Sequence, residues 1–197
     1  MLYTILKPIA WFVFKIIFRV RFVGAENIPE TGGCILTCNH MSLPDPVFLA
    51  IGMKRHLCFM AKAEIFSIKI CSWFFRSLGA YPVRRGARDM AAIRTSTEIL
   101  NKGKMMGIFP QGHRYKGEKL TRFKPGFALI AAHAGVPVVP AYIKTKNQRL
   151  RPFRKVSVIY GKPVTAAELG YTDGSSENLQ QMAAALYEIT EELADRI

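Results

Sequence analysis

Short apolar runs alternate with segments of helical spacing along most of this chain. The runs have the length and composition of buried strands: 34–38, 56–61, 79–83, 105–109, 136–143 and 155–160. The segments around them favour helices: 45–52, 62–75, 89–102, 125–134 and 178–197. This alternation predicts an α/β layered fold, with a central, mostly parallel or mixed sheet flanked by helices. At 197 residues we expect a single domain, 23–197, preceded by a helical segment, 1–22.

The N-terminal segment is almost wholly apolar from Leu2 to Val20. As a helix it would be about 30 Å long, enough to cross a bilayer core. At about 100° per residue, Lys7, Lys15 and Arg19 fall on one side of the helix. Cations gathered on one side favour a membrane-associating helix that lies in the interface; a tilted or re-entrant segment and a core helix are the alternatives. A signal peptide is disfavoured because Lys7 interrupts the apolar region.

Charge indicates the kind of partner. Half of the residues are hydrophobic, yet 28 Lys and Arg stand against 14 Asp and Glu, a net charge of +14. An apolar and basic chain fits an anionic membrane surface, phosphorylated substrates or an acidic carrier. Nucleic acid is disfavoured because no basic helix, zinc-ligand spacing or aromatic RNA-binding box is present in the sequence.

Four cysteines, Cys34, Cys38, Cys58 and Cys71, lie in apolar surroundings without paired C-x-x-C spacing. We expect buried free thiols in a reducing compartment, and neither a metal site nor a cofactor.

A histidine and a carboxylate follow the first apolar run. His40 comes two residues after the predicted strand, and Asp45-Pro46 has the sequence of a helix start, with Asp45 as N-cap. The two side chains can meet on one side of a sheet, where the carboxylate would fix the imidazole tautomer and stabilise the imidazolium of a general base. On spacing alone, a solvated loop histidine beside an ordinary helix cap is the more common arrangement.

The segment 39–45 resembles the N-H-x-x-x-x-D box of the glycerolipid acyltransferases, the 1-acyl-glycerol-3-phosphate acyltransferase family. Three later segments resemble the other boxes in the same order: 79–86 the second, 109–114 the third and 136–140 the fourth. The resemblance covers about 23–161. It implies the glycerol-3-phosphate acyltransferase-like fold and transfer of a fatty acyl group to the sn-2 hydroxyl of 1-acyl-glycerol-3-phosphate, giving phosphatidic acid for phospholipid biosynthesis.

The resemblance also implies roles for single residues. His40 would be the general base, oriented by Asp45. Arg85 in the second box and Arg114 in the third would hold the acceptor phosphate, because a guanidinium binds phosphate as a rigid bidentate fork. Lys124 is a weaker third candidate.

The third box departs from the family pattern, which is usually F-P-E-G-T-R. Gln111 replaces the glutamate and His113 the threonine, so the carboxylate-specific role in acceptor binding does not carry over. Gln111 stays a substrate-binding candidate, as does Gly112, which would let the backbone approach a ligand closely. The fourth box fits either a core strand or the wall of an acyl or acceptor tunnel.

The expected substrates are lysophosphatidic acid and an acyl thioester of acyl-carrier protein or coenzyme A. Ser42 and Cys38 lack the context of a nucleophile elbow, so direct attack by the acceptor hydroxyl is favoured over an acyl-enzyme. We expect backbone N–H groups to stabilise the oxyanion, and the protein to lie on the cytoplasmic face of the cell membrane. Three alternatives stay open: another acceptor (glycerol-3-phosphate, another lysophospholipid or an acylated amine), a thioesterase or lipid hydrolase, and a non-catalytic membrane-binding protein.

Overall fold

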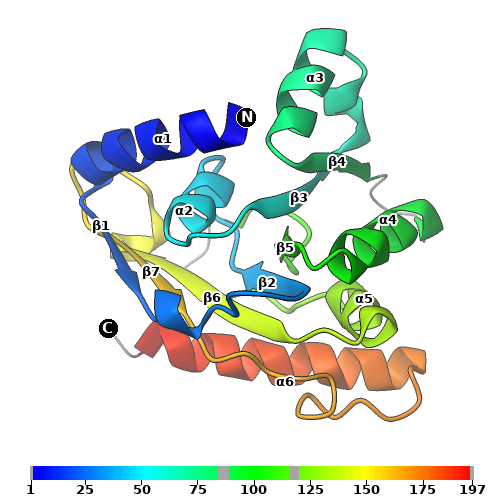
Figure 1. Ribbon diagram of the computed structural model, residues 1–197. Coiled ribbons are helices and arrows are strands. Elements are labelled where there is room, and N and C mark those ends of the chain that lie inside the picture. The colour runs from blue at the N-terminus through cyan, green and yellow to red at the C-terminus, as the bar shows by residue number, and fades with distance from the viewer. Residues whose placement is uncertain (1, 84–88, 116–119, 196–197) are drawn as a thin grey trace.

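The computed structural model describes residues 2–83, 89–115 and 120–195 (Figure 1). Within these residues one seven-stranded sheet has the order β1-β7-β6-β2-β5-β3-β4. The strands are β1 (Val20–Val23), β2 (Cys34–Cys38), β3 (Leu57–Lys62), β4 (Ala80–Val83), β5 (Met105–Ile108), β6 (Val138–Thr145) and β7 (Val156–Tyr160). Only the β6–β7 pair among the described neighbours is antiparallel. The mixed sheet predicted from the sequence is confirmed.

Helices cover both faces of the sheet. In Figure 1, α1 (Leu2–Phe18) and α2 (Asp45–Ile51) lie above it, while α6 (Ser176–Asp195) lies below. Two further helices continue this layer: α5 (Gly126–Ala134) packs against α6, and α4 (Met90–Asn101) packs against α5. The remaining helix, α3 (Lys69–Ser77), stands beyond β3 and β4. Short 3-10 turns cover Ala25–Asn27, Ala63–Phe66 and Lys146–Gln148.

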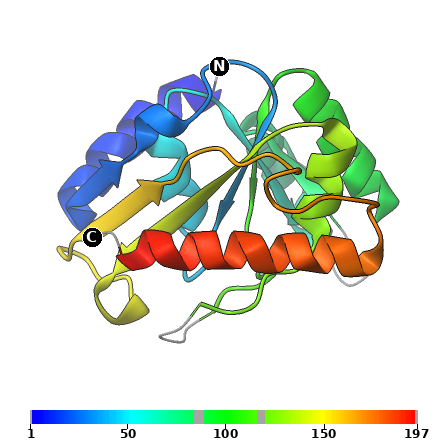
Figure 2. The ribbon, with the colours of Figure 1, turned by 90° about the horizontal axis from the view of Figure 1, so that it is seen from below.

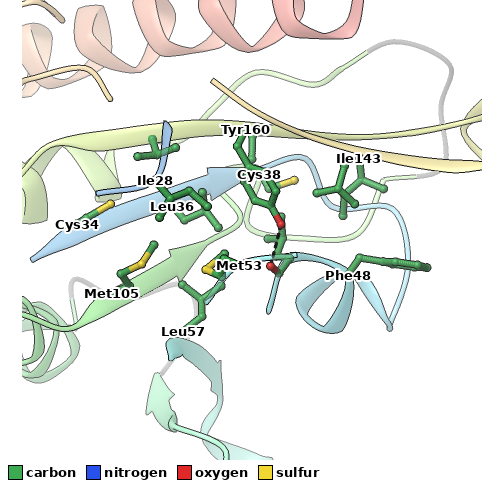
Figure 3. Packing of buried hydrophobic residues seen from close by; sticks show 14 of the residues in the cluster. Ile28, Cys34, Leu36, Cys38, Phe48, Met53, Leu57, Met105, Ile143 and Tyr160 are labelled. Carbon is green, nitrogen blue, oxygen red and sulfur yellow. Dashed lines mark hydrogen bonds between the residues drawn. The ribbon is translucent and has the colours of Figure 1, made fainter. Parts of the chain in front are cut away.

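The sheet separates the two large clusters of the core, and Tyr142, Ile159 and Leu193 form a third, small one. Successive side chains of a strand point to opposite faces, so Leu36 packs in one cluster and Ile35 in the other. The first cluster lies under α2 and includes Phe48 (Figure 3). The Tyr160 hydroxyl there donates a hydrogen bond of 2.9 Å to the Leu49 carbonyl, which joins β7 to α2. Burial raises the pKa of this hydroxyl well above its ordinary value.

The first helix is shorter than the sequence predicted. Arg19 has a left-handed backbone, with φ of 44°, and Val20–Val23 pair with β7. Assigning residues 20–22 to the N-terminal helix was therefore wrong. Valine is a good strand former, and the sheet offers this segment a continuous row of backbone hydrogen bonds.

The helix predicted over 62–75 is interrupted. Lys62 ends β3, and α3 begins only at Lys69. Between them, the N–H and the hydroxyl of Ser67 both donate to the Glu64 carbonyl, at 3.3 and 2.7 Å, and close a turn. Ile68 then takes an extended conformation, which separates the turn from α3.

All four cysteines are free thiols. Cys34, Cys38 and Cys58 are buried, as predicted, but Cys71 on α3 is half-exposed, which corrects the expectation for that residue. Burial raises the pKa of the Cys34 thiol to about 12.

The topology brings several segments to one edge of the sheet. Because β2, β3, β4, β5 and β6 are mutually parallel, their carboxyl ends share that edge, and β7 and β1 begin there. Figure 2 shows that the segments after β5 (green) and β6 (yellow) extend from the same side of the sheet. In open α/β sheets, the carboxyl ends of the strands are where ligands bind.

Candidate active site

A histidine–aspartate pair lies at this edge, directly beyond β2. The Nδ1 atom of His40 is 2.8 Å from Oδ2 of Asp45 at the start of α2. The Asp45 side chain is 1% exposed and that of His40 14%. A carboxylate on Nδ1 fixes the tautomer with the proton on that nitrogen, so Nε2 is left as an acceptor. Among the described residues, Nε2 has no hydrogen-bond partner.

The Asp45 carboxylate also organises the loop that carries His40. Its Oδ2 accepts hydrogen bonds from the backbone N–H groups of Met41 and Ser42, at 2.6 and 2.7 Å. Its Oδ1 accepts the hydroxyl proton of Ser42. The predicted N-cap role is wrong: Pro44 is the N-cap, and no side chain caps the helix. The carboxylate turns back onto the loop instead of toward the N–H groups of α2.

Asn39 attaches the same loop to the sheet, a role that the sequence did not reveal. It is buried, and its side-chain amide pairs with the backbone of Ile143: Oδ1 accepts from the N–H at 2.7 Å and Nδ2 donates to the carbonyl at 3.1 Å. These bonds continue the β2–β6 ladder by one step beyond Cys38. In the sequence, the position of polar Asn39 directly after a buried strand could have indicated this role.

The third box packs against the histidine. The Phe109 ring is stacked on the imidazole, with ring centroids 4.1 Å apart. Gln111 is buried, and its Oε1 accepts a hydrogen bond of 2.6 Å from the backbone N–H of His40. Its Nε2 donates to the Thr121 hydroxyl at 2.7 Å. The N–H of Tyr115 donates to the His40 carbonyl at 2.8 Å. Gln111 of the box and Tyr115, the residue after it, therefore hold the N–H and the carbonyl of His40.

Two of the predicted phosphate ligands belong to this region: Arg114 ends the box, and Lys124 follows it in the chain. Arg114 and Lys124 are exposed, and their side chains have no hydrogen-bond or ion-pair partner among the described residues. Gly112 has φ of +77°, and a Cβ atom there would be 3.2 Å from Nζ of Lys124. The lysine side chain thus passes directly over the glycine. Arg85 lies outside the described residues.

The two residues weighed as nucleophiles are engaged elsewhere. The Ser42 hydroxyl donates to Asp45 and not to the imidazole. The thiol of Cys38 is fully buried, and burial raises its pKa well above the ordinary value. Neither side chain donates a hydrogen bond to the His40 imidazole, the candidate base.

The last three residues of the fourth box, 138–140, are core, while Val136 and Pro137 are half-exposed. Val138 and Val139 are both 0% exposed, and they belong to opposite clusters of the core. The core alternative predicted for this segment is confirmed.

The first helix presents its apolar side outward. Ile9, Phe12 and Ile16 are 55%, 61% and 54% exposed. Nζ of Lys7 instead points into the protein, where it donates to the carbonyls of residues 53, 54 and 55 at 2.5, 3.1 and 3.4 Å. Within the described ranges, no helix combines the length and apolar character that crossing a bilayer requires.

Fold and site together define an α/β protein with a hydrogen-bonded histidine–carboxylate pair at the carboxyl ends of its parallel strands. The chain belongs to the Acyltransferase family, whose sequence model matches residues 19–144.

The relatives agree with this assignment. The chain is 29% identical over 181 residues to the 1-acyl-sn-glycerol-3-phosphate acyltransferase of Bacillus subtilis, which covers 90% of this chain and 89% of that one. It is 28% identical to the enzyme of that name from Streptococcus pneumoniae, over 86% of this chain and 65% of that one.

A solved structure has the same fold. The crystal structure of the 1-acyl-sn-glycerophosphate (LPA) acyltransferase PlsC from Thermotoga maritima superimposes with a TM-score of 0.75, at 29% identity. The match covers 99% of this chain and 80% of that one. The acyltransferase fold implied by the four sequence boxes is confirmed.

Proposed function

We propose that this protein transfers a fatty acyl group from a thioester to the sn-2 hydroxyl of 1-acyl-glycerol-3-phosphate, giving phosphatidic acid in phospholipid synthesis. The observation that carries the proposal is the contact between His40 Nδ1 and Asp45 Oδ2, which leaves Nε2 without a hydrogen-bond partner among the described residues. The relatives in Bacillus and Thermotoga are named for this activity, which supports the same assignment here.

The chemistry follows from the tautomer. Nε2 of His40 accepts the proton of the acceptor hydroxyl while the hydroxyl oxygen forms a bond to the thioester carbonyl carbon. Asp45 stabilises the resulting imidazolium through Nδ1. When the tetrahedral intermediate collapses, the carbon–sulfur bond breaks and the imidazolium returns the proton to the departing thiolate. Direct attack is favoured because Ser42 and Cys38 are both engaged in other contacts.

The cations beside the third box would hold the acceptor phosphate. Arg114 and Lys124 are exposed and free of partners among the described residues, so binding a phosphate would not require an existing ion pair to break. Phosphate binding by Arg85 rests on the resemblance alone. Gly112 supports the same site by leaving room for the Lys124 side chain.

Gln111 fits a positioning role better than direct contact with the substrate. Its carbonyl and its amino group are both hydrogen-bonded within the protein, to the His40 N–H and to Thr121. A glutamate at this position could still accept a hydrogen bond from the His40 N–H. The exchange therefore gives no reason to assign a different acceptor.

The membrane would be met through α1. Its outward apolar side would enter the interface, while Lys7 stays bonded to the protein. The net charge of +14 adds attraction to anionic lipid. Attachment by this helix would bring the sheet edge that carries His40 close to membrane-borne substrates, on the cytoplasmic face.

One assay tests the activity. Purified protein receives a labelled acyl thioester with a panel of 1-acyl-glycerol-3-phosphate, glycerol-3-phosphate and other lysophospholipids, and the product is identified. We expect phosphatidic acid, and thioester cleavage without transfer would contradict the proposal. His40→Ala should abolish transfer while binding to liposomes persists; unchanged turnover would remove His40 as the base.

The cations need a separate measurement. Arg114→Ala should raise KM for the phosphorylated acceptor by about tenfold or more, because a charge-assisted hydrogen bond is lost, with little change in KM for the thioester. Lys102→Ala, an exposed cation at the opposite edge of the sheet, is the matched control. An acceptor KM that moves equally in both variants would exclude Arg114 as the phosphate ligand.

A further inference from the structure

A second group of cations lies on the loop that joins β6 to β7. A cavity of about 200 Å³ there is lined by five residues: Lys146, Asn147, Arg149, Arg151 and Arg154. Four of the five are cationic and none is acidic.

The four cationic side chains lack compensating charge. Within the described part of the chain, none of them has a hydrogen-bond or ion-pair partner. Like charges gathered around one cavity repel one another, and a bound anion would relieve that repulsion. The arrangement is therefore suited to an anionic ligand.

The loop is held in an unusual conformation. Asn147, Gln148 and Phe153 have left-handed backbones, with φ of 56°, 50° and 61°. Such conformations are costly for residues other than glycine and concentrate at functional sites. Two contacts fix the shape: Nε2 of Gln148 donates to the Tyr142 hydroxyl at 2.6 Å, and the N–H of Phe153 donates to the Ile17 carbonyl at the end of α1.

The loop leaves the sheet at the edge that carries His40. In the strand order, β2 lies between β6 and β5, so His40 has this loop on one side and the third box with Arg114 on the other. Gln148, in the middle of the loop, lines a small cavity together with His40 and Tyr142. Gln148 stands in the chain between Asn147 and Arg149 of the cation cavity, so the two cavities lie on the same loop, on the side of His40 away from the proposed acceptor phosphate.

Two phosphate-bearing substrates would meet at such a site. On the proposed function, the acceptor carries one phosphate and the acyl thioester carries another on its pantetheine arm, whether the carrier is a protein or coenzyme A. We propose that the cavity of Lys146, Arg149, Arg151 and Arg154 binds the phosphate of the donor's phosphopantetheine. The donor thioester then approaches His40 from the β6 side while the acceptor hydroxyl approaches from the β5 side.

The test compares two donors that differ by one phosphate. Palmitoyl-4′-phosphopantetheine and palmitoyl-pantetheine carry the same acyl group and thioester. We expect the unaltered protein to prefer the phosphorylated donor by about tenfold or more in kcat/KM, the effect of one or two charge-assisted hydrogen bonds. The variant Arg149→Gln/Arg151→Gln should lose most of this preference, with KM for 1-acyl-glycerol-3-phosphate within twofold of its original value.

A matched control separates a local site from total charge. Lys102→Gln/Lys162→Gln also removes two exposed cations, at the opposite edge of the sheet, and should keep the donor preference. Equal use of both donors by the unaltered protein would overturn the proposal, as would a preference that survives in Arg149→Gln/Arg151→Gln. Thermal unfolding of each variant establishes that the fold is intact.

Membrane lipid is the other source of phosphate for this cavity. Sedimentation with phosphatidylglycerol vesicles should be the same for the two double variants. If only Arg149→Gln/Arg151→Gln lost sedimentation while it kept the donor preference, the cavity would be a headgroup site and the proposal would fall.

A separate measurement keeps this inference distinct from the proposed function. Equilibrium dialysis of labelled 4′-phosphopantetheine needs no turnover. Binding that is lost in Arg149→Gln/Arg151→Gln would support the cavity even if no lysolipid were acylated. Absence of binding to an enzyme that makes phosphatidic acid would overturn the cavity alone.

Discussion

The first and last helices, α1 and α6, are both amphipathic, yet they attach to the protein by opposite sides. The 20-residue α6 turns its apolar side to the sheet, with Leu179, Met182, Leu186 and Leu193 buried. The 17-residue α1 buries none of its residues. Ile9, Phe12 and Ile16 of α1 are exposed, while Phe14 and Phe18 are half-buried against the body of the protein and Lys7 donates hydrogen bonds to it.

Two lysines replace the apolar contacts that α6 makes. Nζ of Lys7 donates to carbonyls at and beyond the end of α2, where the negative end of the helix dipole lies. Nζ of Lys15 donates to the Val20 carbonyl at 2.9 Å. Apolar packing is smaller on this side: Phe14 and Phe18 pack against Phe48, with ring centroids 4.9 and 5.3 Å apart from it.

An amphipathic pattern therefore identifies the two sides of a helix, but it does not tell which side faces the protein. Burial in the core stabilises α6 through the hydrophobic effect. The exposed apolar side of α1 is left for another apolar medium, and we infer that this medium is lipid. Four measurements test this difference in how the two helices are attached.

The largest effect is expected in the core contact of α6. Leu186 is 0% exposed, so Leu186→Ala should lower the free energy of unfolding by about 2–5 kcal/mol. Ile9→Ala, on the exposed side of α1, should change it by less than about 0.5 kcal/mol. Urea unfolding measures both variants. Equal destabilisation would mean that the outer side of α1 is packed in solution.

The second effect concerns lipid. Ile9→Ser/Phe12→Ser should weaken binding to phosphatidylglycerol vesicles by about tenfold or more, because two apolar side chains no longer leave water. The exposed pair on α6, Gln181→Ser/Ala184→Ser, serves as the control and should sediment as the unaltered protein does. If the first variant sedimented unchanged, α1 would not be the membrane contact.

A smaller effect is expected at Lys7. Lys7→Met removes a charged donor to three carbonyls and should cost about 1–2 kcal/mol, measured as faster hydrogen exchange of the α1 amides. The amides of α6 should keep their protection. Lys162→Met, an exposed lysine without a described partner, should change neither helix. Unaltered exchange in α1 would show that packing alone holds this helix.

The smallest effect concerns pH at the N-terminal end of α1. The His56 ring stacks on Tyr3, with centroids 3.7 Å apart. Burial lowers the pKa of His56, and the charges of Lys104 and Lys7 lower it further. The unfolded chain therefore binds more protons below about pH 6.5, so the free energy of unfolding should fall as pH drops through that region. In His56→Gln the pH slope between 7.0 and 5.5, measured by urea unfolding, should be shallower; an identical slope would assign the dependence to other groups.

The sequence predicted the layered fold because every described strand except β1, and most helices, carry a strong local pattern. β2 begins and ends at the predicted residues, 34 and 38, since five consecutive apolar or small residues between turn formers admit few other structures. The prediction from sequence failed where tertiary contacts outweigh the local preference of a segment. Val20–Val23 continue an apolar helix in the sequence, yet they pair with β7, which is more than 130 residues further along the chain.

The site was predictable in part. The pairing of His40 with Asp45 follows from a five-residue spacing across a strand end and a helix start, and the structure brings the two side chains together. Local sequence could not give the contact of Gln111 with the His40 N–H, because it joins segments 71 residues apart. The same holds for Asn39 and Ile143. Such contacts depend on which strands become neighbours in the sheet.

The sequence by itself determined that this chain alternates strands and helices, that it is basic and that its ends are amphipathic helices, because these properties reside in composition and period. The tertiary structure decided which side chains face inward and what lies beside the candidate site. It turned Lys7 of α1 inward, where the carbonyls just beyond the end of α2 accept hydrogen bonds from its ammonium group. It also placed the loop after β6 on one side of His40 and the third box on the other. Both outcomes depend on the order of the strands, which sets what lies beside each side chain and which local pattern cannot fix.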